Sequence, residues 1–325
     1  MPDFPQTARH LVLGGSGFVG RHVALRLAQL GQNVTVADRE RPPPSPHIAA
    51  KGITFVPANV QSTDWDALLS QHDVVHHYVW TTTPQTAVAA PLADLSDNVG
   101  TTIALLEAMR RQGGKRLVFA SSGGTVYGRL KTVPVSEDHA LEPISAYGAS
   151  KTAAETYIGY YCRHFGLDAR IARLSNPYGA GQNPKGSLGA TATFLFRAMN
   201  GEPISIWGDG SVVRDYIHIA DVAEAFARLS MAGHLEKNSN PAVFNIGSGV
   251  GHSLNDIIEV VRSLLKCEIR VDYLEGRSFD VPVSVLDVSL AKAALKWQPR
   301  FNLEAGLARM HADVTGGSPF YSSLS

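Results

Sequence analysis

Cysteine is scarce in this sequence, because the 325 residues contain only Cys162 and Cys267. Two cysteines so far apart exclude a disulfide framework and a cysteine-rich zinc site. The histidines do not have the spacing of metal ligands either, so we predict no metal site. A chain with so few thiols is typical of a reducing compartment, and we predict a cytoplasmic location.

An excess of charge of one sign is also missing, since Lys+Arg and Asp+Glu both number 29. This balance argues against nucleic acid as the main partner, because nucleic-acid binders carry a large basic excess. Long hydrophobic runs are absent as well: the longest uncharged stretch, residues 78–93, contains Pro84 and Pro91. The first apolar run, residues 11–13, stops at once in glycines. We therefore predict neither a membrane span nor a secretory signal.

Short apolar runs alternate with helix-period segments in the first half of the chain. Strands are predicted at residues 9–13, 33–37, 53–56, 73–79 and 116–120, and helices at 19–30, 98–112 and 147–165. This alternation predicts an α/β fold with a Rossmann-like, doubly wound parallel sheet. We predict a nucleotide-binding domain over residues 1–172 with a return segment at 214–233. A smaller, Gly- and Pro-rich substrate-binding region follows at 173–213 and 234–315, then a tail at 316–325.

A glycine-rich turn, residues 14–20, follows the first predicted strand and opens the first helix. Bare backbone N–H groups at a helix N-terminus suit a pyrophosphate, although the same glycines would also serve a plain tight turn. Asp38 ends the second strand, where a carboxylate accepts both ribose hydroxyls and repels a 2′-phosphate. The context favours NAD over NADP, and Arg39 keeps the second cofactor open as an alternative.

Tyr147 and Lys151 lie four residues apart, on one face of a predicted helix. The unperturbed pKa of a phenol is about 10, too high for a general base near neutral pH. A neighbouring ammonium favours the phenolate and is expected to lower that pKa. Hydroxyl side chains at the end of the strand before residue 123 supply a second hydrogen-bond donor. The alternative is a solvated Tyr/Lys pair on an ordinary helix.

These motifs resemble those of the extended short-chain dehydrogenases/reductases, and in particular the NAD-dependent nucleotide-sugar epimerases related to UDP-galactose 4-epimerase. The resemblance runs from about residue 9 to residue 307 and keeps the family order. The motifs are the GxxGxxG turn, Asp38, Ser-Ser-x-x-x-Val-Tyr-Gly ending at Gly128, Tyr147-x-x-x-Lys151, Asn-Pro-Tyr-Gly from Asn176, Val-Arg-Asp-Tyr-Ile-His from Val213, and Arg277-x-x-Asp280.

The resemblance assigns roles to individual residues. It implies that Tyr147 is the acid/base at the C4 hydroxyl and that Lys151 lowers its pKa and binds the nicotinamide ribose. Ser122 is the preferred second hydroxyl and Thr125 the alternative, because the usual position carries Gly123 here. The residues expected to contact NAD are Gly14, Gly17, Phe18, Val19, Gly20, Asp38, Arg39, Asn59, Val60, Asn98, Tyr147 and Lys151.

The second half of the chain is expected to hold a nucleotide sugar. Guanidinium groups bind phosphate oxygens bidentately, which suits Arg214 and Arg277 to a diphosphate. The resemblance adds Asp280 at the uridine ribose, and the remaining expected substrate contacts are Ser122, Asn176, Trp207 and Ser284. The small Ser284 is expected to leave room for an acetamido group. One departure is Tyr78, which is expected to reshape the floor of the nicotinamide pocket.

The predicted function is reversible C4 epimerisation of a UDP-hexose through a 4-keto intermediate with tightly bound NAD. The substrates would be UDP-glucose/UDP-galactose and also UDP-GlcNAc/UDP-GalNAc. The alternatives are an NAD(P)H-dependent nucleotide 4-keto-sugar reductase and a non-catalytic nucleotide-sensing module. A homodimer is predicted because two helices carry apolar residues on more than one face: Ile103, Leu105, Leu106 and Met109, then Ile158, Tyr161 and Phe165.

Overall fold

The structure is a computed structural model that describes residues 7–41, 52–183, 189–233, 239–275 and 281–316. Its centre is a seven-stranded sheet with the order β10-β6-β5-β4-β1-β2-β3, in which every neighbouring pair is parallel. The strands are β1 (Arg9–Leu13), β2 (Asn33–Asp38), β3 (Thr54–Pro57), β4 (Val74–His77), β5 (Arg116–Ser122), β6 (Asp168–Leu174) and β10 (Ala242–Ile246). The predicted Rossmann-like sheet is confirmed.

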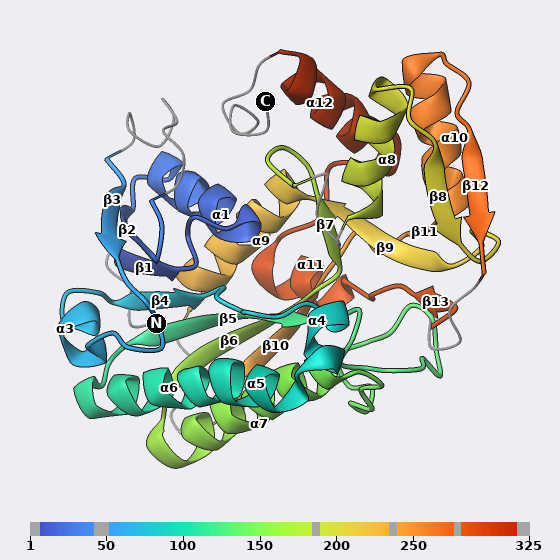
Figure 1. Ribbon diagram of the computed structural model, residues 1–325. Helices are drawn as coiled ribbons and strands as arrows, with labels where there is room; N and C mark the ends of the chain where they lie inside the picture. Colours follow the sequence, from blue (N-terminus) through green and yellow to red (C-terminus); the bar gives the residue numbers. More distant parts are fainter. Residues whose placement is uncertain (1–6, 42–51, 184–188, 234–238, 276–280, 317–325) are drawn as a thin grey trace.

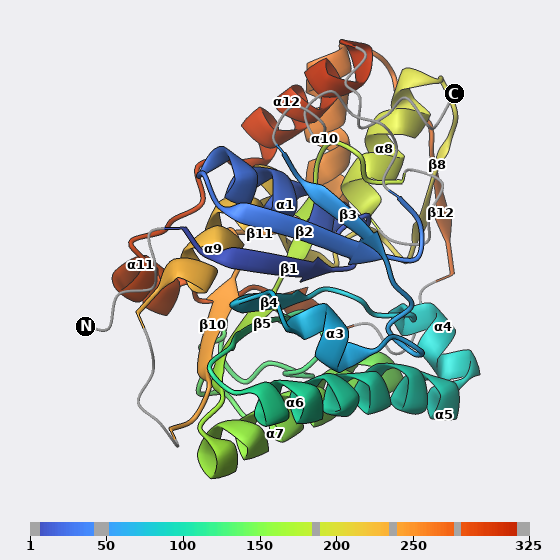
Figure 2. The same cartoon turned by 90° about the vertical axis from the view of Figure 1, so that its left-hand side faces the viewer.

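Helices cover both faces of this sheet, as Figures 1 and 2 show. On one face lie α1 (Phe18–Gln29) and α9 (Ile219–Met231), and on the other lie α6 (Thr101–Gln112) and α7 (Ala146–Phe165). Shorter helices are α3 (Trp65–Leu69), α4 (Pro84–Ala89), α5 (Pro91–Asp94), α11 (Ser289–Leu295) and a π-helix, η1 (Leu95–Gly100), directly before α6.

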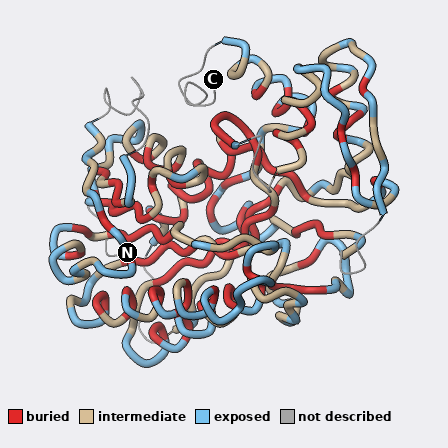
Figure 3. Tube along the Cα trace, in the orientation of Figure 1, coloured by how far each residue is buried: buried red, intermediate tan, exposed pale blue. Residues whose placement is uncertain are grey.

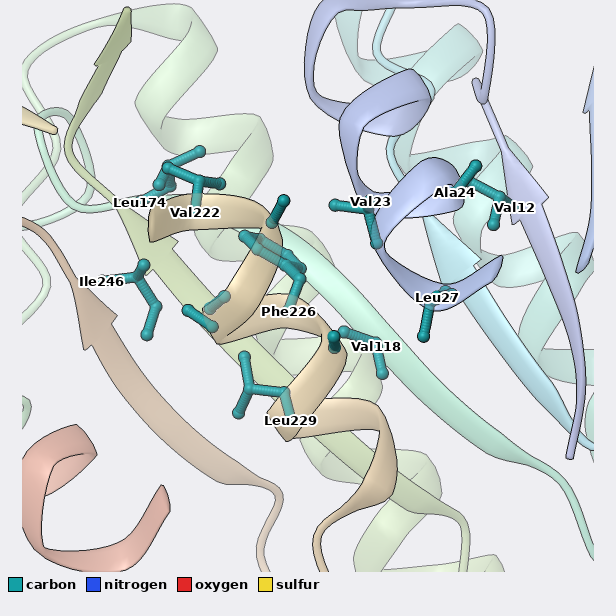
Figure 4. Close-up of a cluster of buried hydrophobic side chains, with 14 of the residues drawn as sticks. Val12, Val23, Ala24, Leu27, Val118, Leu174, Val222, Phe226, Leu229 and Ile246 are labelled. Carbon is teal, nitrogen blue, oxygen red and sulfur yellow. The ribbon is translucent and has the colours of Figure 1, made fainter. Parts of the chain in front are cut away.

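The alternation of side chains along the strands divides the core between these two faces. In β1, Val12 joins the hydrophobic cluster beneath α1 and α9, whereas Leu11 and Leu13 join the cluster above α6 and α7. Figure 4 shows the first cluster around Phe226 of α9. Figure 3 shows buried residues along the strands and exposed residues on the outer sides of α6 and α7.

A smaller region lies beside the large sheet and has its own hydrophobic cluster. It contains a four-stranded sheet in which β9 pairs with β7, β11 and β13, and a two-stranded sheet of β8 and β12. Its elements are β7 (Asn176–Tyr178), α8 (Ala190–Met199), β8 (Ile204–Trp207), β9 (Val213–His218), β11 (Gly251–Ser253), α10 (Leu254–Leu265), β12 (Val271–Leu274), β13 (Val283–Ser284) and α12 (Leu303–Thr315).

The chain therefore crosses between the two regions more than once. The predicted return segment, residues 214–233, contributes α9 to the large sheet, but its first strand, β9, pairs only within the smaller region. The large sheet also receives β10, which lies inside the segment 234–315 that we predicted for substrate binding. Segments of the two regions thus alternate along the chain more often than the predicted domain boundaries imply.

Two buried arginines tie the return segment to the large sheet. Arg116 of β5 donates to Asp168 at 2.8 and 2.9 Å and to the carbonyl oxygen of Ser230 at 2.7 Å. Arg170 of β6 also donates to Asp168, and to the carbonyl oxygen of Gly233. The guanidinium groups satisfy carbonyl oxygens at the C-terminal end of α9, where a helix leaves its last acceptors unpaired.

Candidate active site

The predicted cofactor residues gather at the carboxyl ends of parallel strands. The glycine turn follows β1, Asp38 ends β2, Asn59 and Val60 follow β3, and Ser122 ends β5. In open α/β sheets, ligands bind at this edge, near the point where the strand order reverses. The reversal lies between β1 and β4, which are neighbours in this sheet.

The glycine turn is built so that helix α1 can start close to the strand. Gly14 has a φ of +77°, a conformation that favours glycine, and a Cβ on Gly20 would lie 2.2 Å from the Gly14 carbonyl oxygen. Helix α1 begins at Phe18, and Gly17 offers no side chain to cap it. The first N–H groups of the helix therefore point toward the turn without a side-chain acceptor, as a pyrophosphate site requires.

The Asp38 carboxylate is held at the end of β2 by two backbone donors. It accepts from Ser16 N at 3.0 Å and from Arg39 N at 2.8 Å, while Arg39 itself is exposed. At the end of the next strand, the exposed Asn59 accepts from Gln61 N at 3.2 Å, and Val60 is buried beside it. These residues line one side of the edge that we assign to the adenosine half of a dinucleotide.

Tyr147 and Lys151 lie in the first turns of α7, whose first residues are fixed by a bond from Gly148 N to the Ser145 side chain at 3.1 Å. Lys151 is only 4% exposed, and its Nζ donates to the Ala120 carbonyl oxygen at 2.8 Å. Burial lowers the pKa of Lys151 to about 7, although the carboxylates of Glu155 and Asp94 favour its charged form.

The expected lowering of the Tyr147 pKa is not what the protein alone produces. Burial raises the pKa of the Tyr147 phenol above its ordinary value, and the nearby Asp94 carboxylate raises it further. Burial is the main cause of the raised pKa, and the Nζ atom of Lys151 lies 5.8 Å from the centre of the phenol ring. Tyr147 can therefore act as a base only when its phenolate is stabilised, either by further positive charge or by a hydrogen bond from the reacting hydroxyl.

Of the two candidate hydroxyls, Ser122 ends β5 and Thr125 lies in the turn that follows. The Ser122 carbonyl oxygen accepts from Thr125 N at 3.2 Å and from Val126 N at 3.1 Å, which closes the turn. The Thr125 hydroxyl is buried and makes no hydrogen bond within the described part of the chain. Its residue also lies against α7, because a Cβ on Gly148 would be 2.6 Å from the Thr125 carbonyl oxygen. Both hydroxyls remain candidates.

Asn98 lies in the π-helix η1, and its side chain is fully engaged inside the protein. Its oxygen accepts from Thr81 N at 2.8 Å, and its amide nitrogen donates to Asp94 at 2.9 Å and to Thr82 at 3.2 Å. The side chain thus holds the segment that leaves β4, beside the nucleotide edge. A direct contact between Asn98 and NAD stays a prediction.

Three of the predicted substrate residues, Asn176, Arg214 and Ser284, lie on the neighbouring strands β7, β9 and β13. Ser284 is the register partner of Arg214, and Asn176 Nδ2 donates to the Asp215 carbonyl oxygen at 3.0 Å. Ser284 is buried, with 5% of its surface exposed, whereas Trp207 at the end of β8 is half exposed. Arg277 and Asp280 fall outside the described residues.

Residues 10–247 match the NAD dependent epimerase/dehydratase family. The chain belongs to this family. The resemblance predicted from the motifs is therefore confirmed, and so is the predicted cofactor class, NAD.

Relatives and solved structures agree with this assignment. The chain is 32% identical over 308 residues to a UDP-glucose 4-epimerase of Mycolicibacterium smegmatis, covering 93% of this chain and 96% of that one. It is 30% identical over 308 residues to a dTDP-4-dehydro-6-deoxyglucose reductase of Escherichia coli, covering 92% and 95%. A crystal structure of the Thermotoga maritima UDP-glucose 4-epimerase with UDP-glucose matches with a TM-score of 0.87 and 31% identity, covering 95% and 99%.

The residues of this NAD-dependent family member fit the dinucleotide. The absence of a side chain at Gly20 lets α1 start directly against the Gly14 carbonyl oxygen, so the first N–H groups of the helix lie at the turn where a pyrophosphate would bind. The Asp38 carboxylate is available at the strand end for ribose hydroxyls. Tyr147 and Lys151 of α7 lie against β5, where Lys151 Nζ donates to the Ala120 carbonyl oxygen, and they would hold the nicotinamide half.

The effect of Tyr78 on the nicotinamide pocket stays a prediction, and the sequence reasoning missed a second aromatic residue, Trp80. The Tyr78 ring packs on Phe226 of α9 at 5.2 Å, and its hydroxyl bonds His76 Nδ1 at 2.8 Å, on the α1/α9 side of the sheet. Trp80, two residues later, contacts Tyr147 and Lys151 instead. The chain leaves the regular strand after His77, so the alternation that would place residues 78 and 80 on one face no longer applies.

A separate cavity of about 600 Å³ lies between α1, α9 and α12, and none of the predicted site residues lines it. Its three arginines are already in ion pairs, with Arg26 on Glu224, Arg300 on Asp221 and Arg309 on Asp313.

Within the described ranges, no group of three or more His, Cys, Asp or Glu side chains is arranged to hold a metal ion. No described helix is long and apolar enough to cross a membrane.

Proposed function

We propose that this protein catalyses the reversible C4 epimerisation of a UDP-hexose. The observation that carries the proposal is the placement of Tyr147 and Lys151 on the first turns of α7, with Lys151 bonded to the Ala120 carbonyl oxygen of β5, in a member of an NAD-dependent family. The similarity to the Thermotoga maritima epimerase, which extends over 95% of this chain, supports it.

In this proposal the protein's own residues bind the sugar and move one proton. Bound NAD supplies the reversible oxidation and reduction of the C4 carbon. Tyr147 takes the proton of the C4 hydroxyl and later returns it, and either Ser122 or Thr125 donates a hydrogen bond to the same oxygen. The Lys151 ammonium favours the phenolate, which opposes the effect of burial on the pKa of Tyr147.

The nucleotide end of the substrate must stay bound while the sugar presents each face in turn. We assign this task to Arg214 and Asn176, with Trp207 near the uracil and Arg277 and Asp280 at the diphosphate and ribose. The small side chain of Ser284 beside Arg214 favours acceptance of an acetamido group, so UDP-GlcNAc and UDP-GalNAc are included among the proposed substrates.

We also propose a homodimer in the cytoplasm, on a different basis from the sequence argument. Leu105, Leu106, Met109, Ile158 and Tyr161, which suggested a second apolar face, are buried against this chain's own sheet. The exposed apolar residues of α7 are instead Tyr157, Tyr160 and Phe165. Tyr157 and Tyr160 are three residues apart, and the Tyr160 and Phe165 rings contact each other with centres 5.6 Å apart. This exposed aromatic group supports a partner there.

A second candidate is a nucleotide 4-keto-sugar reductase, because the Escherichia coli relative carries that name. The two candidates differ in how the cofactor is used. An epimerase regenerates its cofactor in each turnover, whereas a reductase consumes reduced cofactor and must exchange it.

The deciding experiment is incubation of the purified protein, without added cofactor, with UDP-galactose and with UDP-GalNAc, and separation of the products by chromatography. We expect UDP-glucose and UDP-GlcNAc to form, and no product with Tyr147→Phe. Turnover only of a 4-keto sugar, and only with added NADH or NADPH, would establish the reductase instead. No turnover of any UDP-sugar under either condition would refute the proposal.

A further inference from the structure

The Lys151 ammonium lies against the face of the Trp80 indole. The distance from Nζ to the centre of the indole is 3.5 Å, compared with 4.9 Å for the Phe119 ring and 5.8 Å for the Tyr147 ring. Trp80 also meets both of these rings edge to face, with centres 6.0 Å from Phe119 and 6.2 Å from Tyr147. The ammonium is therefore surrounded by three aromatic rings, and Trp80 is the nearest.

The indole contributes its face rather than its N–H group. Trp80 Nε1 is buried and makes no hydrogen bond within the part of the chain that the structure describes. Nζ of Lys151 makes its hydrogen bond at 2.8 Å to the Ala120 carbonyl oxygen. An ammonium has three N–H donors, and the Ala120 carbonyl oxygen accepts from only one of them. The face of the indole adds a second attraction for the positive charge.

Four titratable groups from α7, α5 and β4 lie around Lys151. Glu155 and Tyr147 share its helix, Asp94 ends α5, and His77 ends β4. Burial lowers the pKa of His77, and the charge of Lys151 lowers it further, so His77 adds no positive charge near neutral pH.

The two carboxylates are already bound to other groups. Glu155 accepts from Arg173 at 2.7 Å and from Ser121, and Asp94 accepts from Asn98 at 2.9 Å and from Ser150. They act on Lys151 through space, without a direct bond among the described contacts. Trp80 is thus the side chain that meets the ammonium at contact distance.

We propose that Trp80 is a positioning residue for the reaction, whose indole face holds the Lys151 side chain in its charged form beside Tyr147. The ring quadrupole attracts an ammonium and not a neutral amine, so it favours protonation. This opposes the burial that brings the pKa of Lys151 down to about 7. The inference rests on the proposed role of Lys151, but it concerns a protonation equilibrium that can be measured without turnover.

The first test measures the pKa of Lys151 by NMR in protein labelled with ¹³C at the lysine Cε, with the signal assigned by its loss in Lys151→Met. Trp80→Leu keeps an apolar side chain but has no aromatic face, and Trp80→Phe is the matched control that retains one. We expect the pKa of Lys151 to fall by about one unit in Trp80→Leu. In Trp80→Phe it should stay close to the wild-type value.

A second measurement does not depend on the folding of Trp80→Leu. Fluorination of tryptophan withdraws electron density from the ring face with little change in volume. The wild-type chain is labelled with mono- to tetrafluorotryptophan, and Trp80→Phe, which keeps the other three of the chain's four tryptophans, is labelled in the same way. We expect the pKa of Lys151 to fall stepwise with fluorination in the wild-type chain and to remain constant in Trp80→Phe.

Equal changes in the pKa of Lys151 in Trp80→Leu and Trp80→Phe would show that Trp80 acts only by packing, and an unchanged pKa in all variants would overturn the inference.

Turnover gives a separate readout. At pH 7, a fall from a pKa of about 7 to about 6 reduces the charged fraction from about one half to about one tenth. We therefore expect kcat of Trp80→Leu to fall about fivefold, with Trp80→Phe near wild type. A shifted pKa in a protein that turns over no UDP-hexose would refute the proposed function and leave this inference standing.

Discussion

The buried ion pair between Glu155 and Arg173 makes the replacement Glu155→Leu a sharp test of what holds α7 to the sheet. Arg173 Nη2 donates to Glu155 at 2.7 Å and its Nε contacts both carboxylate oxygens at 3.2 Å. Both side chains are only 6% exposed. Removing one partner of such a pair leaves the other charge buried, which costs about 3–5 kcal/mol. We expect Glu155→Leu to lose that much of its free energy of unfolding.

The double variant Glu155→Leu/Arg173→Leu completes a double-mutant cycle. With both charges gone, no ion is left buried, so we expect the double variant to be less destabilised than the sum of the two single variants. The interaction energy should be about 2–3 kcal/mol. The measurement is urea unfolding followed by circular dichroism and tryptophan fluorescence, whose transitions must coincide.

Additive losses in the double variant, or a loss below about 1 kcal/mol in Glu155→Leu, would contradict this reasoning. The Glu155/Arg173 pair lies close to the candidate active site, so we also expect an effect on kcat. Glu155 lies one helical turn after Lys151, and its carboxylate also accepts from Ser121, the residue before Ser122. Glu155→Leu should therefore lower kcat at temperatures where the variant is still fully folded.

Four further outcomes follow from the site and the surface. Tyr147→Phe should lower kcat by about 10²–10⁴-fold while the amount of co-purified NAD stays unchanged; a loss of only a few-fold would show that another group moves the proton. Ser122→Ala should cost a similar factor if Ser122 is the second donor, and a larger loss in Thr125→Ala would reverse that assignment. Ser284→Tyr should remove activity on UDP-GlcNAc and retain it on UDP-glucose, by overpacking of about 1–3 kcal/mol; equal losses on both substrates would mean that Ser284 does not control substrate size. Light scattering at micromolar concentration should give a dimer mass for the wild type and a monomer mass for Tyr160→Glu, and a wild-type monomer would exclude the proposed interface.

Regular elements of the large sheet follow from local patterns, so the sequence predicts them well. Strands β1 to β5 and helices α1 and α7 lie where apolar periodicity placed them, within a few residues. The predicted helix at 98–112 is different: the structure begins it with the π-helix Leu95–Gly100. A π-helix is defined by backbone hydrogen bonds from i to i+5, which the spacing of apolar side chains does not identify. Strands β6 and β10 were not predicted; they are neighbours in the sheet, and their pairing joins residues that are far apart in sequence.

The candidate site shows the same division between local and distant information. The glycine turn and the Tyr147/Lys151 pair depend on spacing within one element, which the sequence shows directly. The contact between Trp80 and Lys151 joins the exit of β4 to the middle of a helix, and no spacing rule reports it. The raised pKa of Tyr147 also depends on burial, which the sequence-based argument underestimated.

The guanidinium groups of Arg116 and Arg170 have a consequence for the order in which the protein is made. Both arginines leave the ribosome well before Ser230 and Gly233, whose carbonyl oxygens they bind in the finished structure. Until then, both guanidinium groups lack these carbonyl acceptors, and the outer edge of β6 has no strand beside it. The nucleotide-binding half therefore receives part of its hydrogen bonding and one edge strand from residues that are synthesised after it. We expect the two regions to complete their folding together.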